Sequence, residues 1–452
     1  MKGYNEYKDV ELPWLKKIPV SWKLLRNKNV FEEKKELVGN RQKEFDLLSL
    51  TKKGIIIRDV SSGKGKFPKD FETYKVVQSG DIIFCFFDVD ETPRTVGLSK
   101  YNGMITGAYN VFDICNVVPE YVLYYNMAID NIKGYKPLYS GLRKVIPLQA
   151  FFATKMPVPS KPEQDKIVQF LDWKTSEMSR FIHQKKKQIK LLEELKLTRI
   201  NNLVTKGLIH DVKYKQSNVE WLEEIPEHWD VDHIKQHFKV KKRIAGKEGY
   251  DVLSITQQGI KKKDISSNEG QMAQSYANYQ FVYPGDFAMN HMDLLTGYID
   301  ISKQFGVTSP DYRVFTLSDS EHCFAPFYLR VFQIGYKRKI FYKFGKGAAN
   351  QGRWRLPITA FYDYAIQVPP IDEQREIARQ CDEVEKQIDE MISGINKEIT
   401  LVEELRTKLI SDVVTGQVDV RDVKIPTYET ETDIDDSEDD TDEESPDESM
   451  EE

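Results

Sequence analysis

The chain has 452 residues, of which 40% are hydrophobic, 12% aromatic and 30% charged, so it can bury more than one hydrophobic core. No stretch approaches the roughly 18 apolar residues of a membrane span, and the first residues lack the apolar segment of a signal peptide. We therefore expect a cytoplasmic protein without a membrane segment.

The net charge of −6 hides two parts of opposite sign. Residues 427–452 hold 15 acidic residues and no basic ones, which leaves 56 acidic and 65 basic residues, a net of +9, in residues 1–426. A basic body suits phosphate binding, although +9 is a modest excess for its length. The acidic tail lacks the apolar residues needed for a core, so we expect residues 427–452 to be disordered.

Short apolar runs between glycine-containing turns predict strands in the first part of the chain. Ile55–Ile57 and Ile82–Phe87 are such runs, and helix signals are sparse before residue 118. A short helix is then expected over Glu120–Met127. The sequence Ser160-Lys161-Pro162-Glu163 has the form of a capping box and predicts the start of a long helix.

The same order of elements then occurs a second time. The matching segments are 14–22 with 221–229, 45–51 with 250–256, and Glu163-Gln164 with Glu373-Gln374, at offsets of 207, 205 and 210. The short helix has its counterpart at Phe327–Ile334. This period far exceeds the roughly 20–50 residues of a solenoid unit, so it indicates duplication of a whole domain.

Apolar residues recur at spacings of three and four in both long helices, close to the 3.5-residue period of a coiled-coil seam. The residues predicted to pack are Ile182, Ile189, Leu192 and Leu195 in the first helix and Ile392, Ile395, Ile399 and Val402 in the second. Lys185 and Arg199 interrupt the first stripe. One such stripe is usually a face of a bundle helix, but two equivalent stripes can cover each other. We therefore expect an antiparallel helix pair that acts as a spacer between two globular domains.

Catalytic signatures are absent from the sequence. It contains no P-loop, dinucleotide-binding, zinc-protease, serine-hydrolase or adenine-methyltransferase motif, so we predict no catalytic residue. The four cysteines are Cys85, Cys115, Cys323 and Cys381, and none forms a CxxC pair or has a histidine at zinc-finger spacing. We therefore predict reduced cysteines and no metal site.

Two looser groupings of polar residues also occur. Asp70, Glu72 and Lys75 resemble a nuclease triad, but such spacing is common in charged sequence. His291 and Asp293 are the histidine–carboxylate pair worth testing for metal binding, although a surface or core role is the more common one for such residues.

Two sets of motifs follow one another in the same order. They are Trp14, Ile18-Pro19, Trp22, Pro159 and Glu163-Gln164, then Trp221, Ile225-Pro226, Trp229, Pro370 and Glu373-Gln374. This doubled order resembles the specificity subunit of Type I restriction-modification systems over about residues 10–420. No single motif is specific, whereas the doubled order is, and the acidic tail departs from the family pattern.

The resemblance implies an α+β protein with two target-recognition domains in a pseudo-two-fold arrangement, each reading one half of a bipartite DNA target. It also implies that the long helices set the gap between the half-sites and dock two adenine-methyltransferase subunits, with ATP-dependent restriction subunits, the motor and nuclease, beyond them. S-adenosylmethionine, ATP and magnesium would belong to these partners, so this chain would bind no cofactor and would be non-catalytic by itself.

The predicted organisation has five parts. They are a first recognition domain at 1–158, a first spacer helix at 159–208, a second recognition domain at 209–368, a second spacer helix at 369–418 and the acidic tail at 427–452.

Candidates for DNA contact are cationic and amide side chains in the globular domains, because such groups bind base edges and phosphates. They are Lys52, Lys53, Arg58, Lys64, Lys66, Arg94, Arg143, Lys144, Lys261, Lys262, Lys263, Asn290, Arg313, Gln351, Arg353 and Arg355. Arg143 and Arg353 are favoured because they stand at the repeat offset of 210, whereas a single lysine is more often a solvated surface charge. We expect the four repeated tryptophans to be packing anchors and the Glu-Gln pairs to be caps or docking residues.

Two other functions stay open at this point. One is a coiled-coil adaptor that binds protein alone, which salt-sensitive DNA binding would count against. The other is a stand-alone nuclease or methyltransferase with a diverged site, which an assay with DNA, magnesium and S-adenosylmethionine would test.

Overall fold

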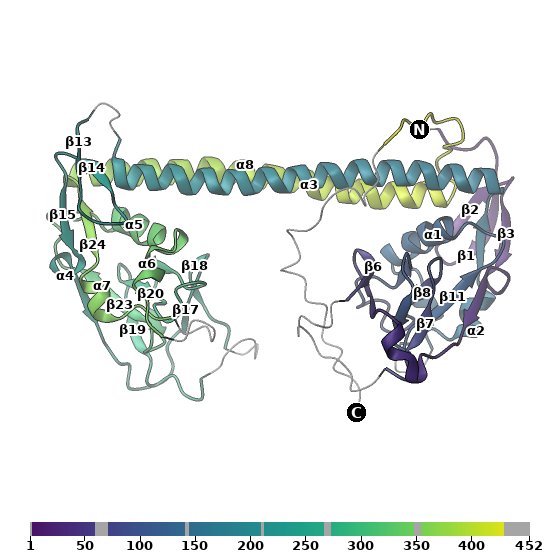
Figure 1. Cartoon of the computed structure of the whole chain (residues 1–452), viewed down its shortest axis with the longest axis horizontal. Helices are drawn as coiled ribbons and strands as arrows, with labels where there is room; N and C mark the ends of the chain where they lie inside the picture. The colour runs from purple at the N-terminus through teal and green to yellow at the C-terminus, as the bar shows by residue number, and fades with distance from the viewer. Residues whose placement is uncertain are drawn as a thin grey trace. The chain divides into compact units, whose positions relative to one another are not determined.

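The computed structural model describes residues 2–58, 71–140, 144–208, 212–265, 273–347 and 354–428. The chain forms two compact units, the first made of residues 1–185 and 397–452 and the second of residues 186–396. Each unit is a mixed α+β domain that includes part of both long helices (Figure 1), which confirms the predicted fold class. Almost all of the tail predicted to be disordered lies outside the described residues.

Short strands dominate the first unit. They are β1 (Tyr7–Leu12), β2 (Leu15–Pro19), β3 (Lys23–Arg26), β4 (Phe31–Lys34), β5 (Leu48–Thr51), β6 (Gly54–Ile57), β7 (Lys75–Val77), β8 (Ile82–Phe84), β9 (Val96–Leu98), β10 (Gly103–Ile105), β11 (Asn110–Ile114) and β12 (Lys155–Val158). The helices are α1 (Pro119–Asn131) and α2 (Leu148–Ala153), with 3-10 turns at Asn27–Asn29, Gly39–Glu44 and Lys136–Leu138. The predicted short helix is confirmed as α1 and the first predicted strand as β6, whereas β8 covers only the first half of the strand predicted over Ile82–Phe87.

The second unit contains the corresponding elements. Its strands are β13 (Tyr214–Gln216), β14 (Glu224–Pro226), β15 (Asp230–His233), β16 (Phe238–Lys241), β17 (Leu253–Thr256), β18 (Gly259–Lys262), β19 (Gln280–Val282), β20 (Phe287–Met289), β21 (Ile299–Ile301), β22 (Gly306–Thr308), β23 (Arg313–Leu317) and β24 (Ala365–Val368). Its short helices are α4 (Ile234–His237), α5 (Ala325–Lys337), α6 (Ile340–Lys343) and α7 (Ile358–Tyr362). The predicted helix at Phe327–Ile334 is confirmed as α5.

The sheets of the two units share one topology. The central sheet has the order β4-β11-β8-β9 in the first unit and β16-β23-β20-β21 in the second, with antiparallel neighbours. The pairs β3–β12, β5–β6 and β7–β10 correspond to β15–β24, β17–β18 and β19–β22. This agreement confirms that the sequence repeat is a duplicated fold.

Each central sheet carries a group of buried phenylalanines. In the first unit the rings of Phe31, Phe84 and Phe112 lie 5.6–5.9 Å apart between centroids. In the second unit Phe238, Phe287 and Phe315 occupy the same strands, with centroids 5.0–5.8 Å apart. All six side chains are at most 3% exposed, so the two cores are built from equivalent residues.

The long helices are α3 (Lys161–Lys206) and α8 (Ile371–Val414). In the first unit the start of α3 packs against the end of α8, where Ser179 accepts a hydrogen bond from Arg406 and Lys185 pairs with Glu398 at 2.6 Å. In the second unit Lys196 of α3 pairs with Asp389 of α8 at 2.7 Å. Partner numbers fall on α8 as they rise on α3, so the helices are antiparallel, as predicted.

The predicted seam needs one correction on α3. Ile395 and Ile399 are buried and Leu192 packs against the core of the second unit, but Leu195 is 46% exposed. An α-helix has 3.6 residues per turn, so a straight helix drifts away from a 3.5-residue stripe. The inward position after Leu192 is therefore Lys196, whose stem is covered while its amine reaches Asp389.

The predicted packing residues Ile182, Ile189, Ile392 and Val402 are half-buried. Among the described residues, every helix is too short or too polar to pass through a lipid bilayer.

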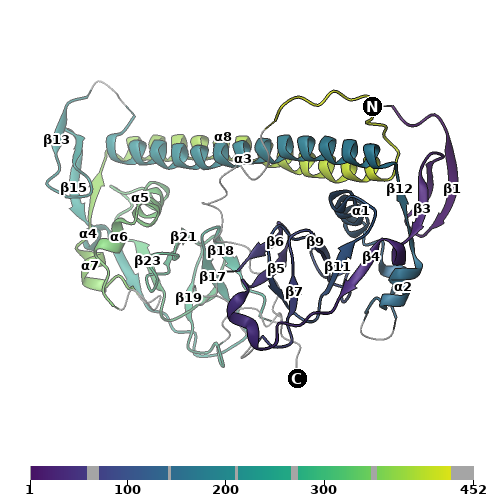
Figure 2. The same cartoon turned by 45° about the vertical axis from the view of Figure 1, so that its right-hand side comes forward.

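In each unit a short helix is attached to a long one. The Tyr124 hydroxyl of α1 donates a 2.7 Å hydrogen bond to Asp172 of α3, and Arg330 of α5 pairs with Asp382 and Glu385 of α8, each at 2.7 Å. Figure 2 shows α1 beside α3 in the first unit. Each globular domain is thus attached to the helix that follows it in the sequence.

Candidate nucleic-acid interface

Each long helix begins at a buried tryptophan. The Trp22 indole N–H donates a 3.0 Å hydrogen bond to the Glu163 carboxylate, and the Tyr4 hydroxyl donates another at 2.7 Å. In the second unit the Trp229 indole donates a 3.0 Å bond to Glu373. Both indoles are fully buried, which confirms the packing role predicted for Trp22 and Trp229. Trp14 and Trp221 are half-buried and pack against the cores of their units.

These contacts give Glu163 a role other than the predicted capping box. Its carboxylate accepts side-chain hydrogen bonds from another part of the unit, and the α3 backbone donates to the Ser160 carbonyl. Burial and the adjoining Glu163 carboxylate raise the pKa of Tyr4, so its hydroxyl remains a donor.

The glutamine that follows each glutamate attaches the helix to the loop before the short helix. The Gln164 carbonyl oxygen accepts the Val118 N–H at 2.8 Å, and its amide donates to the Pro159 carbonyl at 2.9 Å. Gln374 accepts the Phe324 N–H at 2.7 Å and donates to the Pro369 carbonyl at 2.8 Å. The repeated Glu-Gln pair is therefore an anchor in both units.

The other end of each long helix stops at a glycine. Gly207 follows α3 with a φ of 77°, and Gly416 follows α8 with a φ of 72°, a conformation that glycine adopts readily. A Cβ at Gly207 would lie 3.0 Å from the Trp229 ring, and one at Gly416 would lie 3.2 Å from Trp22. Each tryptophan thus contacts the start of one long helix and the end of the other.

The β5–β6 and β17–β18 hairpins present matched tips. Thr51 and Gly54 flank Lys52-Lys53, and in the second unit Thr256 and Gly259 flank Gln257-Gln258. In both turns the threonine hydroxyl donates to the glycine carbonyl, at 3.0 and 2.9 Å, and the glycine has a φ near 100°. All four tip residues are exposed, so one turn displays two different polar pairs.

The strand that leaves each tip also differs between the units. In β6 the exposed residues are Ile56 and Ile57, whereas Lys261 and Lys262 stand at the same places in β18. Lys261 contacts the side chain of Gln258, and Lys262 pairs with Asp251 at 2.6 Å. Arg58 and Lys263, next along each strand, are half-buried. The hairpins pack beside β9 and β21 (Figure 2).

Two predicted cations of the first unit are held by carboxylates. Arg94 is 18% exposed and lies 3.8 Å from Asp130, and burial lowers its pKa. Lys144 pairs with Glu91 at 2.7 Å and Asp90 at 3.6 Å. Both side chains already have partners that a phosphate would have to displace.

The prediction that Arg313 contacts DNA is wrong for this structure. Its side chain is 5% exposed, stacks over the Phe361 ring and donates to the Leu356 carbonyl at 2.9 Å. Burial lowers its pKa to about 10. Residue type suggested a DNA contact, but position at the start of the central strand β23 places the guanidinium in the interior.

Other predicted contacts have varied surroundings. Asn290 is half-buried in a turn, where its side chain accepts the Met292 N–H at 3.2 Å, whereas Arg355 is exposed. The predicted contacts outside the described residues are Lys64, Lys66, Arg143, Gln351 and Arg353. Gln257 and Gln258, which hold the places of Lys52 and Lys53 in the repeat, were not singled out from the sequence.

The residues of the possible nuclease triad and of the His291–Asp293 pair have other partners in the structure. Lys75 donates to the Tyr109 carbonyl at 2.6 Å, and Asp70 lies outside the described residues. The Asp293 carboxylate accepts the Leu295 and Thr296 N–H groups. Burial and the adjoining Arg313 and Arg355 lower the pKa of His291 to about 3, so it is neutral near pH 7.

Comparison with known proteins agrees with the duplicated architecture. The family model described as "Type I restriction modification DNA specificity domain" matches residues 226–401. A Methanocaldococcus jannaschii protein named as the putative type I restriction enzyme MjaX specificity subunit is 23% identical over 89% of this chain and 95% of its own length. The MjaVIII specificity subunit of the same organism is 24% identical over 60% of this chain and 63% of its own length.

The chain is thus similar to Type I restriction-modification specificity subunits along most of its length, and residues 226–401 match the DNA specificity domain of that family. A specificity subunit selects DNA within a restriction-modification complex and is not itself the catalyst. A solved chain from work on complex assembly and conformational transition of the type I system has the same fold, with a TM-score of 0.59 and 12% identity over 89% of this chain and 99% of its own.

Proposed function

We propose that each unit of this specificity subunit reads one half of a bipartite DNA target and that the hairpin tips take part in the reading. The observation that carries this proposal is one turn that displays Lys52-Lys53 in the first unit and Gln257-Gln258 in the second. Glutamine forms paired hydrogen bonds with adenine, whereas lysine suits guanine or phosphate. A shared scaffold with different polar ends is what recognition of two different half-sites requires.

The remaining exposed cations then supply contacts to the DNA backbone. Lys261 and Lys262 lie on the strand directly after the second tip, and Arg355 is exposed in the same unit. Phosphate contacts fix the register of a protein on the duplex without reading sequence. Lys262 would exchange its exposed partner Asp251 for a phosphate, a small loss because surface ion pairs contribute little.

The long helices are proposed to set the gap between the half-sites. α3 begins at the Glu163 anchor of the first unit and stops at Gly207 beside Trp229 of the second. A helix of 46 residues is about 69 Å long at about 1.5 Å per residue. Because α8 is anchored in the same way in the reverse direction, two rods fix the same separation.

Partner subunits are proposed to dock on two equivalent leucine pairs. Leu191 and Leu195 of α3 are 57% and 46% exposed, and Leu401 and Leu405 of α8 are 63% and 53% exposed. Each pair has the spacing that places two residues on one helix face, and the pairs stand at the repeat offset of 210. Exposed apolar pairs on polar helices favour protein contacts, and two equivalent pairs fit two copies of one partner.

The partners that fit are two adenine-methyltransferase subunits, with restriction subunits beyond them. S-adenosylmethionine would bind to the former, and ATP and magnesium to the latter. Because the complex acts on the DNA of its host cell, we place this chain in the cytoplasm.

The tip proposal is tested by exchanging the tips within the whole system. Gln257→Lys with Gln258→Lys gives the second unit the tip of the first, and mapping of methylated adenines in the host genome reads the outcome. We expect methylation at the original target to fall at least about tenfold, because each lost paired contact costs about 1–3 kcal/mol. The half-site that survives should be the one read by the first unit.

Two matched variants complete this test. Lys52→Gln with Lys53→Gln should alter the opposite half-site, and Lys408→Gln on the exposed face of α8 should alter neither. An unchanged methylation pattern in both tip variants would remove the hairpins from the reading surface.

The docking proposal has a separate readout, the stoichiometry of the purified complex. Leu401→Ser with Leu405→Ser should remove one of the two methyltransferase copies, and the same changes at Leu191 and Leu195 should remove one as well. With all four leucines changed, the chain should still fold but should purify without any methyltransferase subunit. Retention of both copies by the fourfold variant would contradict the proposed surface.

A further inference from the structure

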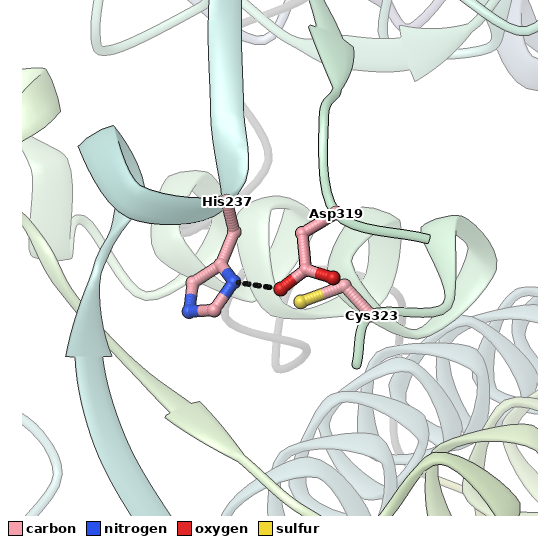
Figure 3. Close-up of side chains that lie close together, drawn as sticks. All are labelled: His237, Asp319 and Cys323. Carbon is pink, nitrogen blue, oxygen red and sulfur yellow. Dashed lines mark hydrogen bonds and ion pairs between the residues drawn. The ribbon is translucent and has the colours of Figure 1, made fainter. Parts of the chain in front are cut away.

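A histidine of the second unit lies between two carboxylates and beside a thiol. His237 ends α4, and its Nδ1 atom lies 3.0 Å from Asp319 while its Nε2 atom lies 3.0 Å from Asp232. Cys323 is in the same loop as Asp319, and the ligand atoms of His237, Asp319 and Cys323 all lie within 4.8 Å of one another (Figure 3). His237 and Cys323 are 7% and 2% exposed, so the group is set into the protein.

The hydrogen bonds define a site for a cation. A neutral imidazole has one N–H, and Asp232 is placed to accept it from Nε2. The bare Nδ1 lone pair would then face a carboxylate oxygen of Asp319 at 3.0 Å. Two acceptors at that distance repel each other, so either a second proton or a metal ion has to stand between them.

The donor set favours zinc as this ion. Imidazole nitrogen, thiolate sulfur and carboxylate oxygen are the groups that zinc binds in proteins, whereas magnesium and calcium prefer oxygen alone. In a tetrahedral site with bonds of about 2.0–2.3 Å, ligand atoms lie about 3.3–3.8 Å apart. Small side-chain rotations bring the three atoms to that spacing.

Asp232 has the place of a typical outer partner of a zinc-bound histidine. A ligating histidine usually donates its other ring N–H to a carboxylate, which fixes the tautomer and the ring orientation. The contact between Nε2 and Asp232 supplies this arrangement on the side of the ring that faces away from Asp319. An N–H on Nε2 that donates to Asp232 would leave Nδ1, the nitrogen beside Asp319, to bind a metal.

The first unit shows that the shared fold does not require these polar groups. Ser318 N–H donates to the His237 carbonyl as Cys115 N–H donates to the Val30 carbonyl, both at 2.8 Å, so Val30 is the counterpart of His237. Phe324 and Val118 donate to equivalent glutamines. The residue before them is Cys323 in one unit and Val117 in the other.

The second-unit loop is also longer. Five residues, 319–323, separate Ser318 from Phe324, whereas two, 116 and 117, separate Cys115 from Val118. Val30 and Val117 are buried, so a pair of valines satisfies the same scaffold. The insertion brings in Asp319 and leaves Cys323 beside it, which makes the cluster a specific feature of the second unit.

We propose that His237, Asp319 and Cys323 bind one zinc ion, with Asp232 orienting the histidine and water completing the coordination. This site departs from the sequence-based expectation of no metal. Burial raises the pKa of the Cys323 thiol to about 11, so zinc binding releases that proton to solvent as the thiolate forms.

The proposed role of the ion is to hold the Asp319–Cys323 loop in place where the second unit contacts the start of α8. The Asp319–Cys323 loop leads to Phe324, whose N–H donates to Gln374, and Gln374 in turn donates to the His322 carbonyl at 2.7 Å. A metal that holds this loop to α4 holds the Gln374 anchor of α8 in place. The arrangement that competes with zinc is a protonated His237 between two aspartates beside a neutral thiol.

Cobalt substitution distinguishes the two arrangements. The purified full chain, stripped with a chelator, is titrated with Co²⁺, and zinc affinity is then measured by competition with a coloured chelator. We expect one equivalent of Co²⁺ with a thiolate-to-cobalt charge-transfer band, lost in Cys323→Ser and kept in Cys381→Ser. Asp232→Asn should keep the band and lower the zinc affinity about 10–100-fold.

A variant with the residues of the first unit shows whether loss of metal binding could result from misfolding. His237→Val with Cys323→Val introduces the buried valines that the equivalent scaffold already accepts, so its circular dichroism spectrum should match the wild type while metal binding is lost. A full chain that binds no more Co²⁺ than this double variant would overturn the proposal. So would a charge-transfer band that persists in Cys323→Ser.

Discussion

The tip of the β5–β6 hairpin carries two lysines, and the same tip in the second unit carries two glutamines. By contrast, Phe31 and Phe238 hold one place in the two cores, on β4 and β16. A buried phenylalanine contacts many neighbours at once, whereas an exposed tip side chain contacts fewer. The comparison teaches that the two copies diverge where a change costs the fold little and alters what the surface can bind.

Divergence also reaches the interior of the second unit. The Ile146 N–H donates to the Phe86 carbonyl as the Leu356 N–H donates to the His291 carbonyl, so a buried phenylalanine has a histidine as its counterpart. His237 stands in the same relation to Val30. Polar groups in the core need partners, and the second unit supplies them to His237 with Asp232 and Asp319.

The largest expected effect on stability comes from the buried tryptophan that the two units share. Trp22→Ala and Trp229→Ala should each lower the free energy of unfolding by about 3–5 kcal/mol, because each removes a fully buried indole and its hydrogen bond. Urea unfolding followed by circular dichroism measures both. Trp173→Ala, at a half-buried site on α3, serves as the smaller control. A near-neutral result at either anchor would break the equivalence of the units.

A smaller effect is expected from His291, the buried residue that the second unit has in place of Phe86 of the first. The folded-state pKa of His291, about 3, lies below its unfolded value of 6.5. The unfolded chain therefore binds more protons between these values, and the unfolding free energy falls as pH drops through this window by up to about 1.4 kcal/mol per pH unit. His291→Phe, which copies Phe86, should lessen this fall between pH 6.5 and 4.5.

Unfolding free energies at several pH values check this expectation. The exposed His183, replaced by Gln, provides the surface control. Equal pH dependence in wild type and His291→Phe would show that the interior difference carries no energetic consequence.

The smallest effect tests the helix seam. Leu195→Ala should change the unfolding free energy by less than about 0.5 kcal/mol, as surface changes usually do, whereas Ile399→Ala should lower it by about 2–4 kcal/mol. Urea unfolding of both variants measures the difference. Similar losses of unfolding free energy in both variants would indicate that Leu195 packs between the helices, contrary to its exposed position.

The duplication, the long helices and the tryptophan anchors could be predicted because they depend on patterns spread along the chain. The repeat offsets and the spacing of three and four contain enough residues to average out local exceptions. The domain boundaries remain predictions, although the long helices themselves run over Lys161–Lys206 and Ile371–Val414.

Single positions were harder because they depend on small geometric differences. Leu195 was misplaced because a helix turns by 3.6 residues, and Arg313 because a guanidinium in sequence carries no sign of its burial. Gln257 and Gln258 were missed because cationic side chains are the stronger sequence signal for DNA contact. His237 and Asp319 stand 82 residues apart, so no local spacing could connect them.

A helix that is anchored at both ends can change its length only in steps that keep both anchors correctly oriented. Each added residue lengthens it by about 1.5 Å and turns its far end by about 100°. One residue added to α3 alone would therefore turn Gly207 away from the Trp229 ring, because Trp229 is also held by Glu373 of α8. Seven residues add about 10.5 Å and return within about 20° of the starting phase. At about 3.4 Å per base pair, such a step equals about three base pairs. If the long helices set the gap between the half-sites as proposed, that gap should change in jumps of this size, made in α3 and α8 together.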